Sequence, residues 1–267
     1  MSQFKDSRGG DNDLERKKLH LDMMAQMGQE RKQRIYAAMD VKLGSYVLDV
    51  GCGVGADTLP LAQLVGSTGR VVGIDRDSAA ITEAQNRAAQ AGVNGWTEHR
   101  VVDANVLPFD DNTFDACHSE RVFMHLEWPE VVLSEMLRVT KSGGRIVLID
   151  PDGASMSINS DEMEIERRLL PVWSLLQKNP YAGRRALRLF KQLGVEDVTV
   201  TIEPAINRDL EMARYIAKMD DMLEKGVALG IISQEEVERF NADVEQAAAL
   251  DATLAYMCMI TTVGRKP

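Results

Sequence analysis

Three acidic residues stand at the ends of apolar runs that are typical of buried strands. Asp49 lies two residues before a glycine-rich turn, Asp75 ends the run 71–74, and Asp103 follows Val101-Val102. Because the carboxyl ends of neighbouring parallel strands form one edge of a sheet, we expect these three carboxylates to serve one ligand. Carboxylates attract a cationic group and accept hydrogen bonds from hydroxyl and amino groups.

The glycine turn itself contains Gly51, Gly53 and Gly55, directly after the apolar run 47–50. Glycine lets the backbone bend sharply and lets a ligand approach bare peptide. Gly51, Gly53 and Ala56 also fit the G-x-G-x-x-G/A pattern of dinucleotide-binding turns, so the glycines alone leave NAD open. The acid before Gly51 favours another ligand, because it repels a pyrophosphate and attracts an ammonium or sulfonium group.

The second and third acids extend this interpretation to a whole nucleoside. Asp75 follows Gly51 by about 24 residues (75 minus 51), which suits one strand–helix–strand unit and a carboxylate that accepts both ribose hydroxyls. Asp103, with Ala104, is placed to take a hydrogen bond from an adenine amino group. An amine, a ribose and an adenine together favour S-adenosyl-L-methionine, with S-adenosyl-L-homocysteine as the product, over NAD.

With these residues the chain resembles the class I S-adenosylmethionine-dependent methyltransferases, and among them the ubiquinone/menaquinone biosynthesis (UbiE-like) group. The resemblance runs from about Tyr46 to Asp152. The motifs that carry it are residues 47–55, Gly73-Ile74-Asp75, Asp103-Ala104, residues 114–120, Leu137-Arg138-Val139 and Gly143-Gly144-Arg145.

The resemblance implies a set of cofactor-binding residues. Arg76 departs from the pattern, because many relatives carry an apolar residue there, although its methylene groups would cover the adenine. Ser119 is expected to contact the cofactor through its backbone. The full set is Asp49, Gly51, Cys52, Gly53, Gly55, Asp75, Arg76, Asp103, Ala104 and Ser119.

Methyl transfer to a nucleophile depends mainly on holding the two reactants in line, and a base is needed only for a hydroxyl or an unactivated carbon acid. The segment 114–126 is expected to pass beside the reacting methyl group. Glu120 and His125 are its candidate catalytic bases, and His125 matches the second histidine of a His-His-Leu run in relatives. His118, inside the strand, is interpreted as a buried structural histidine. The three scattered cysteines predict no metal site.

Strands that alternate with helices predict an α/β fold with a doubly wound, mostly parallel sheet. The resemblance implies seven strands in a Rossmann-like methyltransferase fold, with the last two antiparallel at one edge and with helical lid insertions. We expect a flexible N-terminal tail (1–18), an N-terminal helical segment (19–45) and a methyltransferase domain (46–267). The lid insertions are expected at about 151–180 and 205–250.

Composition narrows the partners. A net charge of −10, from 31 basic and 41 acidic residues, opposes nucleic-acid binding. No apolar run reaches the roughly 18 residues of a membrane span, so we expect a cytoplasmic protein. A small-molecule substrate is expected, and a homo-oligomer is compatible with the sequence.

The lid segments carry many of the 14 methionines, and aromatic residues make up only 5% of the chain. Such a lining suits an apolar acceptor, such as a secondary metabolite, quinone precursor or isoprenoid-like compound, but the same residues at helical spacing also suit the core of the lid. Two alternatives stay open: a nicotinamide-dependent oxidoreductase, although no Tyr-x-x-x-Lys pair is present, and a protein that binds the cofactor without catalysis. The acceptor atom is not assigned.

Overall fold

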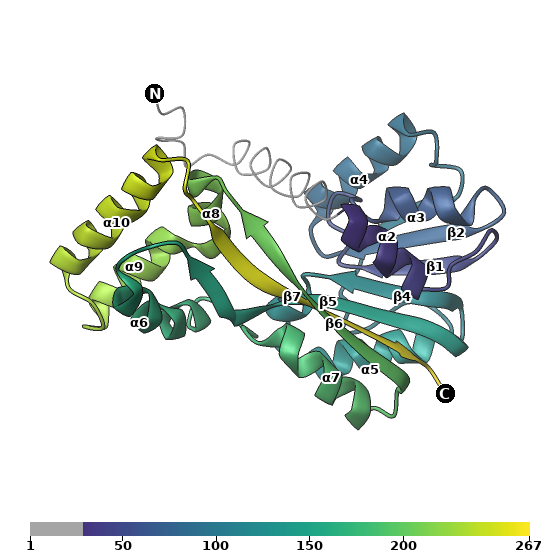
Figure 1. Ribbon diagram of the computed structural model, residues 1–267. Helices are drawn as coiled ribbons and strands as arrows, with labels where there is room; N and C mark the ends of the chain where they lie inside the picture. The colour runs from purple at the N-terminus through teal and green to yellow at the C-terminus, as the bar shows by residue number, and fades with distance from the viewer. Residues whose placement is uncertain (1–28) are drawn as a thin grey trace. The chain divides into compact units, whose positions relative to one another are not determined.

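The computed structural model describes residues 29–267 (Figure 1). The expected tail and the first part of the expected helical segment, residues 1–28, lie outside the described residues. The described chain divides into two units. The first comprises residues 29–118 and Glu135–Arg145, and the second comprises Ser119–Ser134 and Ile146–Pro267.

The first unit alternates strands and helices, as the sequence predicts. The strands pair in parallel, with Tyr46 opposite Arg70 in one pair and Val71 opposite Thr97 in the next. Each crossover helix therefore returns the chain to the same end of the sheet. The elements are α2 (Gln29–Ala38), β1 (Tyr46–Val50), α3 (Thr58–Val65), β2 (Arg70–Asp75), α4 (Ser78–Gln90) and β3 (Thr97–Val101).

Local sequence explains these boundaries. Four of the five β1 residues and four of the six β2 residues are buried, as expected of strands covered on both faces. Asp77 caps α4, because its side chain accepts hydrogen bonds from the amides of Ala79 and Ala80. The carboxyl ends of β1 and β2, where Asp49 and Asp75 lie, are thereby fixed by packing and by a helix cap.

The sheet has seven strands in the order β3-β2-β1-β4-β5-β7-β6, which confirms the predicted fold class. β1 pairs in parallel with β4, whereas β6 and β7 pair antiparallel, as the resemblance implies. β4, α5 and β5 pass from one unit into the other. The remaining strands and α5 are β4 (Phe114–Glu120), α5 (Pro129–Val139), β5 (Thr140–Ile158), β6 (Glu196–Asn207) and β7 (Ala255–Arg265).

The second unit also contains α6, between β5 and α7, and α8 to α10, between β6 and β7. In Figure 1, α6, α8, α9 and α10 gather near one end of the paired strands β6 and β7. The second insertion holds three helices rather than the two helical patterns in the sequence, because Lys218, with φ of 48°, breaks α8 from α9. The elements are η1 (Phe123–His125), α6 (Met163–Ser174), α7 (Ala182–Gln192), α8 (Leu210–Ala217), α9 (Met219–Ala228) and α10 (Gln234–Ala249).

β5 is much longer than the run 145–150 suggests, and it continues to Ile158. From sequence alone, the carboxylate pair of Asp150-Pro151-Asp152 at the end of a strand predicts a solvated turn, and the structure contradicts this prediction, because Asp150 is 2% exposed and Asp152 is 7% exposed. Both are compensated within the second unit, Asp152 by an ion pair with Arg184 and Asp150 by backbone amides. Among residues 29–267, no helix is long and apolar enough to cross a membrane.

Candidate functional site

The glycine turn of the first unit has the backbone conformation that its sequence demands. Gly51, Gly53 and Gly55 have φ values of 75°, 53° and 85°, in the left-handed region that favours glycine. The amides of Gly51 and Cys52 donate to the carbonyl oxygen of Ile74, at 2.7 and 2.9 Å. The turn is therefore fastened to the end of β2.

Asp75 strengthens that link. Its Oδ2 accepts a hydrogen bond from the Gly53 amide at 3.0 Å, and its Oδ1 accepts one from the Asp77 amide at 2.9 Å. Each carboxylate oxygen has a further lone pair, so Asp75 retains the capacity to accept ribose hydroxyls. The acid at the end of β2 thus orders the turn and still offers acceptors to a ligand.

Asp49 forms the buried end of this site. It is 2% exposed, and its Oδ1 lies 2.9 Å from His118 Nδ1 on the paired strand β4. Its Oδ2 is buried and has no hydrogen-bond partner among residues 29–267. Burial raises the pKa of Asp49, and the hydrogen bond and charge of His118 oppose that shift. A buried carboxylate oxygen without a partner is costly, so Asp49 Oδ2 fits the ammonium group of a ligand.

The field around the turn is negative. Burial, followed by the charges of Asp49, Asp75 and Asp57, raises the pKa of the Cys52 thiol. The Cys52 thiol is therefore neutral, and the charges of three nearby carboxylates act on it. Such a cluster favours a cationic ligand over a pyrophosphate.

Asp57 was not among the residues predicted for the site. Lys32 Nζ and Tyr36 Oη of α2 both donate to Asp57 Oδ1, at 2.5 and 2.6 Å. The four-residue spacing of Lys32 and Tyr36 places both on one face of α2, and Asp57 stands two residues after Gly55. The sequence shows the spacing of Lys32 and Tyr36 and the position of Asp57, but it does not show that these distant segments pair.

The predicted adenine residues occupy a different environment. Asp103 is exposed, and its Oδ1 accepts hydrogen bonds from the backbone and side-chain nitrogens of Asn105, at 2.9 and 2.7 Å. The Val102 amide donates to the carbonyl oxygen of Asp75 at 3.0 Å, which brings the start of this loop to the end of β2. Arg76 is exposed and Ala104 half-buried. The structure therefore joins Asp49, the glycine turn and Asp75, whereas Arg76, Asp103 and Ala104 are more accessible to solvent.

The remaining predicted residues lie in the second unit. Ser119 is fully buried, and its Oγ has no hydrogen-bond partner in the described part of the chain. The Glu120 side chain is only 6% exposed, and Arg121 after it has φ of 58°. His125 is exposed on η1. The two predicted bases thus have opposite environments, a buried carboxylate and a surface imidazole.

Asp150 is the neighbour of Glu120 that sequence reasoning undervalued. Burial and the charge of Glu120 raise its pKa to about 8, against the opposing effect of the hydrogen bonds from the Met124 and Phe123 amides. Those amides lie 3.0 and 3.3 Å from its carboxylate oxygens. Asp150 is therefore largely protonated at neutral pH and holds η1 beside Glu120.

Asn179 holds the same segment through its carbonyl groups. Its amide nitrogen donates to the Met124 carbonyl oxygen at 3.0 Å, and its Nδ2 donates to the Phe123 carbonyl oxygen at 3.2 Å. Asp150 and Asn179 together satisfy four backbone groups of η1. The Asn-Pro-Tyr-Ala-Gly-Arg-Arg tract in the sequence was the available signal for this role.

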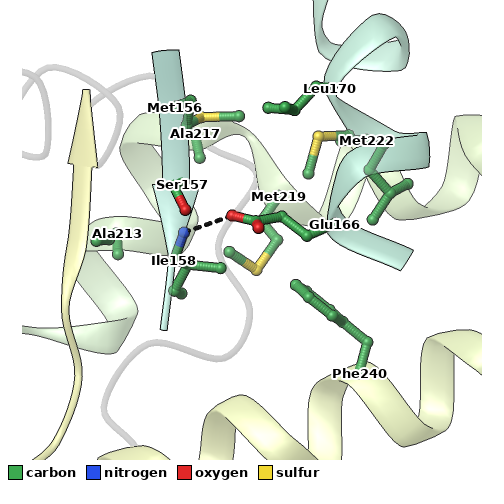
Figure 2. Close-up of a pocket in the computed structure, with 12 residues that line it drawn as sticks. Met156, Ser157, Ile158, Glu166, Leu170, Ala213, Ala217, Met219, Met222 and Phe240 are labelled. Atoms are coloured by element: carbon green, nitrogen blue, oxygen red, sulfur yellow. Dashed lines mark hydrogen bonds between the residues drawn. The ribbon is translucent and has the colours of Figure 1, made fainter. Parts of the chain in front are cut away.

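The methionine-rich helices of the second unit enclose a small apolar cavity of about 30 Å³ (Figure 2). Met219 and Met222 are 3% and 4% exposed and belong to the core of this helical cluster. In the described part of the chain, Glu166 is the one acidic residue of the cavity wall, and its Oε1 accepts a hydrogen bond from the Ile158 amide at 2.7 Å. In this conformation the methionines act mainly as core, as the alternative interpretation of the lid expected.

Comparison with known proteins agrees with this geometry. Residues 42–194 match the family described as "Methyltransferase domain". A demethylmenaquinone methyltransferase of Shouchella clausii is 32% identical over 179 residues, which cover 61% of this chain and 75% of that protein. A 37.1 kDa transposon protein of Streptomyces fradiae is 30% identical over 216 residues, 80% of this chain and 62% of that protein.

Among solved structures, the YcgJ protein of Bacillus subtilis superposes with a TM-score of 0.65 at 18% identity, over 89% of this chain and 98% of that one. This match supports the fold. The chain belongs to the class I S-adenosylmethionine-dependent methyltransferase family and is related to its UbiE-like members. It spans about half to three quarters of the length of the first curated relatives that it matches.

Proposed function

We propose that this protein transfers a methyl group from S-adenosyl-L-methionine to a small, largely apolar organic acceptor. The observation that carries the proposal is the buried, unpartnered Oδ2 of Asp49 beside a left-handed glycine turn and within a cluster of carboxylates. Family membership supports the same chemistry. A nicotinamide cofactor fits this site less well, because the carboxylates would repel its pyrophosphate.

The residues of the first unit divide the work of binding. Asp49 and the glycine turn would hold the methionine portion, Asp75 the ribose, and Asp103 with Ala104 the adenine. When bound, the cofactor supplies a methyl group that its sulfonium has already activated. The protein then has to bind, orient and exclude water, which can contribute about 7–11 kcal/mol in the best cases.

For an acceptor that must lose a proton, Glu120 is the better supported of the two proposed bases. Its side chain is nearly buried, next to an Asp150 carboxyl whose raised pKa keeps it neutral at pH 7. A general base acts within hydrogen-bond reach of the proton that it removes, and Glu120 ends β4, in the segment that is expected beside the reacting methyl group. His125 is exposed, and a role for it requires an acceptor at the surface of η1.

An apolar acceptor is favoured by the methionine-rich helical cluster of the second unit. The methionine side chain adapts its shape, so the cavity near Met156 and Met219 can enlarge at little cost (Figure 2). The demethylmenaquinone methyltransferase matched above is named for a quinone substrate, which agrees with this class of acceptor.

The test is methyl transfer by the full chain, with formation of S-adenosylhomocysteine followed by mass spectrometry. The acceptors are a quinol, a phenol, an isoprenoid alcohol and, as polar controls, glycine and a sugar. We expect turnover with at least one apolar acceptor and none with the polar controls. Cofactor binding without turnover on an extended metabolite panel would instead favour the non-catalytic alternative.

A Glu120→Gln variant separates binding from proton transfer. It should bind S-adenosylmethionine like the wild type and lose turnover with hydroxyl acceptors. A His125→Gln variant is the matched comparison. If E120Q retains full turnover with a hydroxyl acceptor, Glu120 is not the base.

A further inference from the structure

A second hollow of the molecule lies wholly within the second unit, along α7. Its volume is about 280 Å³, much larger than the apolar cavity near Met156. Phe123, Pro129 and Asn179 line it together with residues of the helix. The α7 side is formed by Ala182, Arg185, Ala186, Arg188, Leu189 and Gln192.

The charge of this groove is opposite to that of the chain. The protein carries a net charge of −10, yet among residues 29–267 the groove is lined by two arginines and no acidic residue. α7 itself has the sequence AGRRALRLFKQ and holds no aspartate or glutamate. Because arginine is always charged at neutral pH, the groove is a fixed cationic feature.

Neither groove arginine is neutralised within residues 29–267. Arg185 donates to the neutral amide oxygen of Asn179 at 3.2 Å and lies over the Tyr181 ring, 5.6 Å from its centroid. Arg188 forms no hydrogen bond or ion pair in this part of the chain. Arg184, by contrast, is paired with Asp152 and does not line the groove.

The other half of the groove is apolar. Phe123 is buried, and Ala182 and Ala186 leave room because their side chains are short. Leu189 and Pro129 complete a surface on which a hydrocarbon group loses contact with water. The groove therefore combines two guanidinium groups with an apolar wall.

We propose that this groove binds a small organic phosphate, with the phosphate on Arg185 and Arg188 and the organic group against the apolar wall. A phosphate monoester carries a charge of about −1.5 to −2 at pH 7, which matches two guanidinium groups better than a single carboxylate does. Guanidinium forks also match the geometry of phosphate oxygens. This inference does not depend on the proposed methyl transfer, because it uses only residues of the α7 groove.

Calorimetric titration of the full chain with phenyl phosphate tests the proposal, at constant ionic strength. We expect saturable binding with a Kd in the millimolar range or tighter. Inorganic phosphate should bind several-fold more weakly because it lacks the organic group, and phenol should not bind. Benzoate should also bind more weakly, since it has a single negative charge.

The variants locate the binding. R185M/R188M should weaken phenyl phosphate binding at least about tenfold, through loss of charge-assisted hydrogen bonds. K191M removes one charge from the same helix outside the groove and should change the Kd less than about twofold, which controls for general electrostatic attraction. If the double variant does not fold, R188M alone provides the test. The Arg188 side chain forms no hydrogen bond or ion pair within residues 29–267, so its loss should not prevent folding.

Absence of saturable binding would overturn the proposal. An unchanged Kd in R188M and R185M/R188M, or an equal loss in K191M, would also overturn it. Equal affinity for phenyl phosphate and inorganic phosphate would contradict the proposed role of the apolar wall.

Discussion

The glycine turn of the first unit and the helical cluster of the second are built on different principles. In the turn, backbone hydrogen bonds and a few carboxylates define the site within 27 residues of sequence (49 to 75, both ends counted). In the cluster, apolar side chains from Ile158 to Val244 define a core mainly through packing. The polar turn discriminates between ligands by their charge, whereas the apolar cluster can be repacked with little loss of stability.

Removing the charge of Asp49 should have the largest effect on cofactor binding. Asp49→Asn keeps the volume and an acceptor for His118, and it would delete the charge-assisted hydrogen bond that we propose between Asp49 and the cofactor's ammonium group. We expect about 10- to 100-fold weaker binding of S-adenosylmethionine, from about 1.5–3 kcal/mol. Calorimetry measures it.

The matched control is Asp110→Asn, an exposed acid of the same unit with the same change of charge. It should leave the affinity unchanged. Equal affinity of D49N and wild type would mean that Asp49 serves the fold alone.

Packing in the second unit can be disturbed without touching the turn. A Cβ at Gly153 would overlap the ring of Trp173, which is 1% exposed. Gly153→Ala should therefore cost about 1–3 kcal/mol of unfolding free energy and lower the Tm, with the affinity for S-adenosylmethionine unchanged. Gly95→Ala, where a Cβ meets nothing within 4 Å, is the control and should leave the Tm nearly unchanged.

The buried Asp150 makes the stability of the protein depend on pH. Its pKa rises from 3.8 to about 8 on folding, so the folded state holds the proton more tightly than the unfolded state. The stability that this provides is complete below about pH 4 and is lost as the pH rises to about 8. Urea unfolding of wild type and Asp150→Asn across this range measures the difference between their free energies of unfolding. The advantage of the wild type should shrink as the pH rises and should vanish or reverse at high pH. A difference that is constant with pH would refute the shift.

The smallest expected effect is on the KM of the methyl acceptor. Met156 is half-buried at the small apolar cavity, and Met156→Ala should change the KM of an apolar acceptor by a few-fold while leaving the affinity for the cofactor intact. Met163→Ala, at a position that is 59% exposed, should have no effect. An unchanged KM in M156A would count against a cavity that admits the acceptor.

The same contrast explains what the sequence could predict. The turn depends on neighbours in the chain, so the spacing of Asp49, Gly51 and Asp75 was sufficient to predict the strands, the turn and a cationic ligand. The order of alternating strands and helices was sufficient to predict the parallel part of the sheet, whereas its antiparallel edge was implied by the family resemblance.

What the sequence did not reveal depends on distant partners. Asp150 and Asp152 read as a solvated turn, because nothing nearby shows that the amides of η1 and Arg184 compensate them. Asp57 was overlooked because its partners Tyr36 and Lys32 precede it by 21 and 25 residues (57 minus 36 and 57 minus 32). Burial and long-range pairing decide such cases, and neither has a local pattern.

We propose that the carboxylate-rich glycine turn binds S-adenosylmethionine. Calorimetric titration of the full chain with S-adenosylmethionine, S-adenosylhomocysteine and NAD tests it most directly. We predict saturable binding of the first two, lost or strongly weakened in D49N, and no binding of NAD. Binding of NAD alone, or of none of the three at millimolar concentration, would contradict the account.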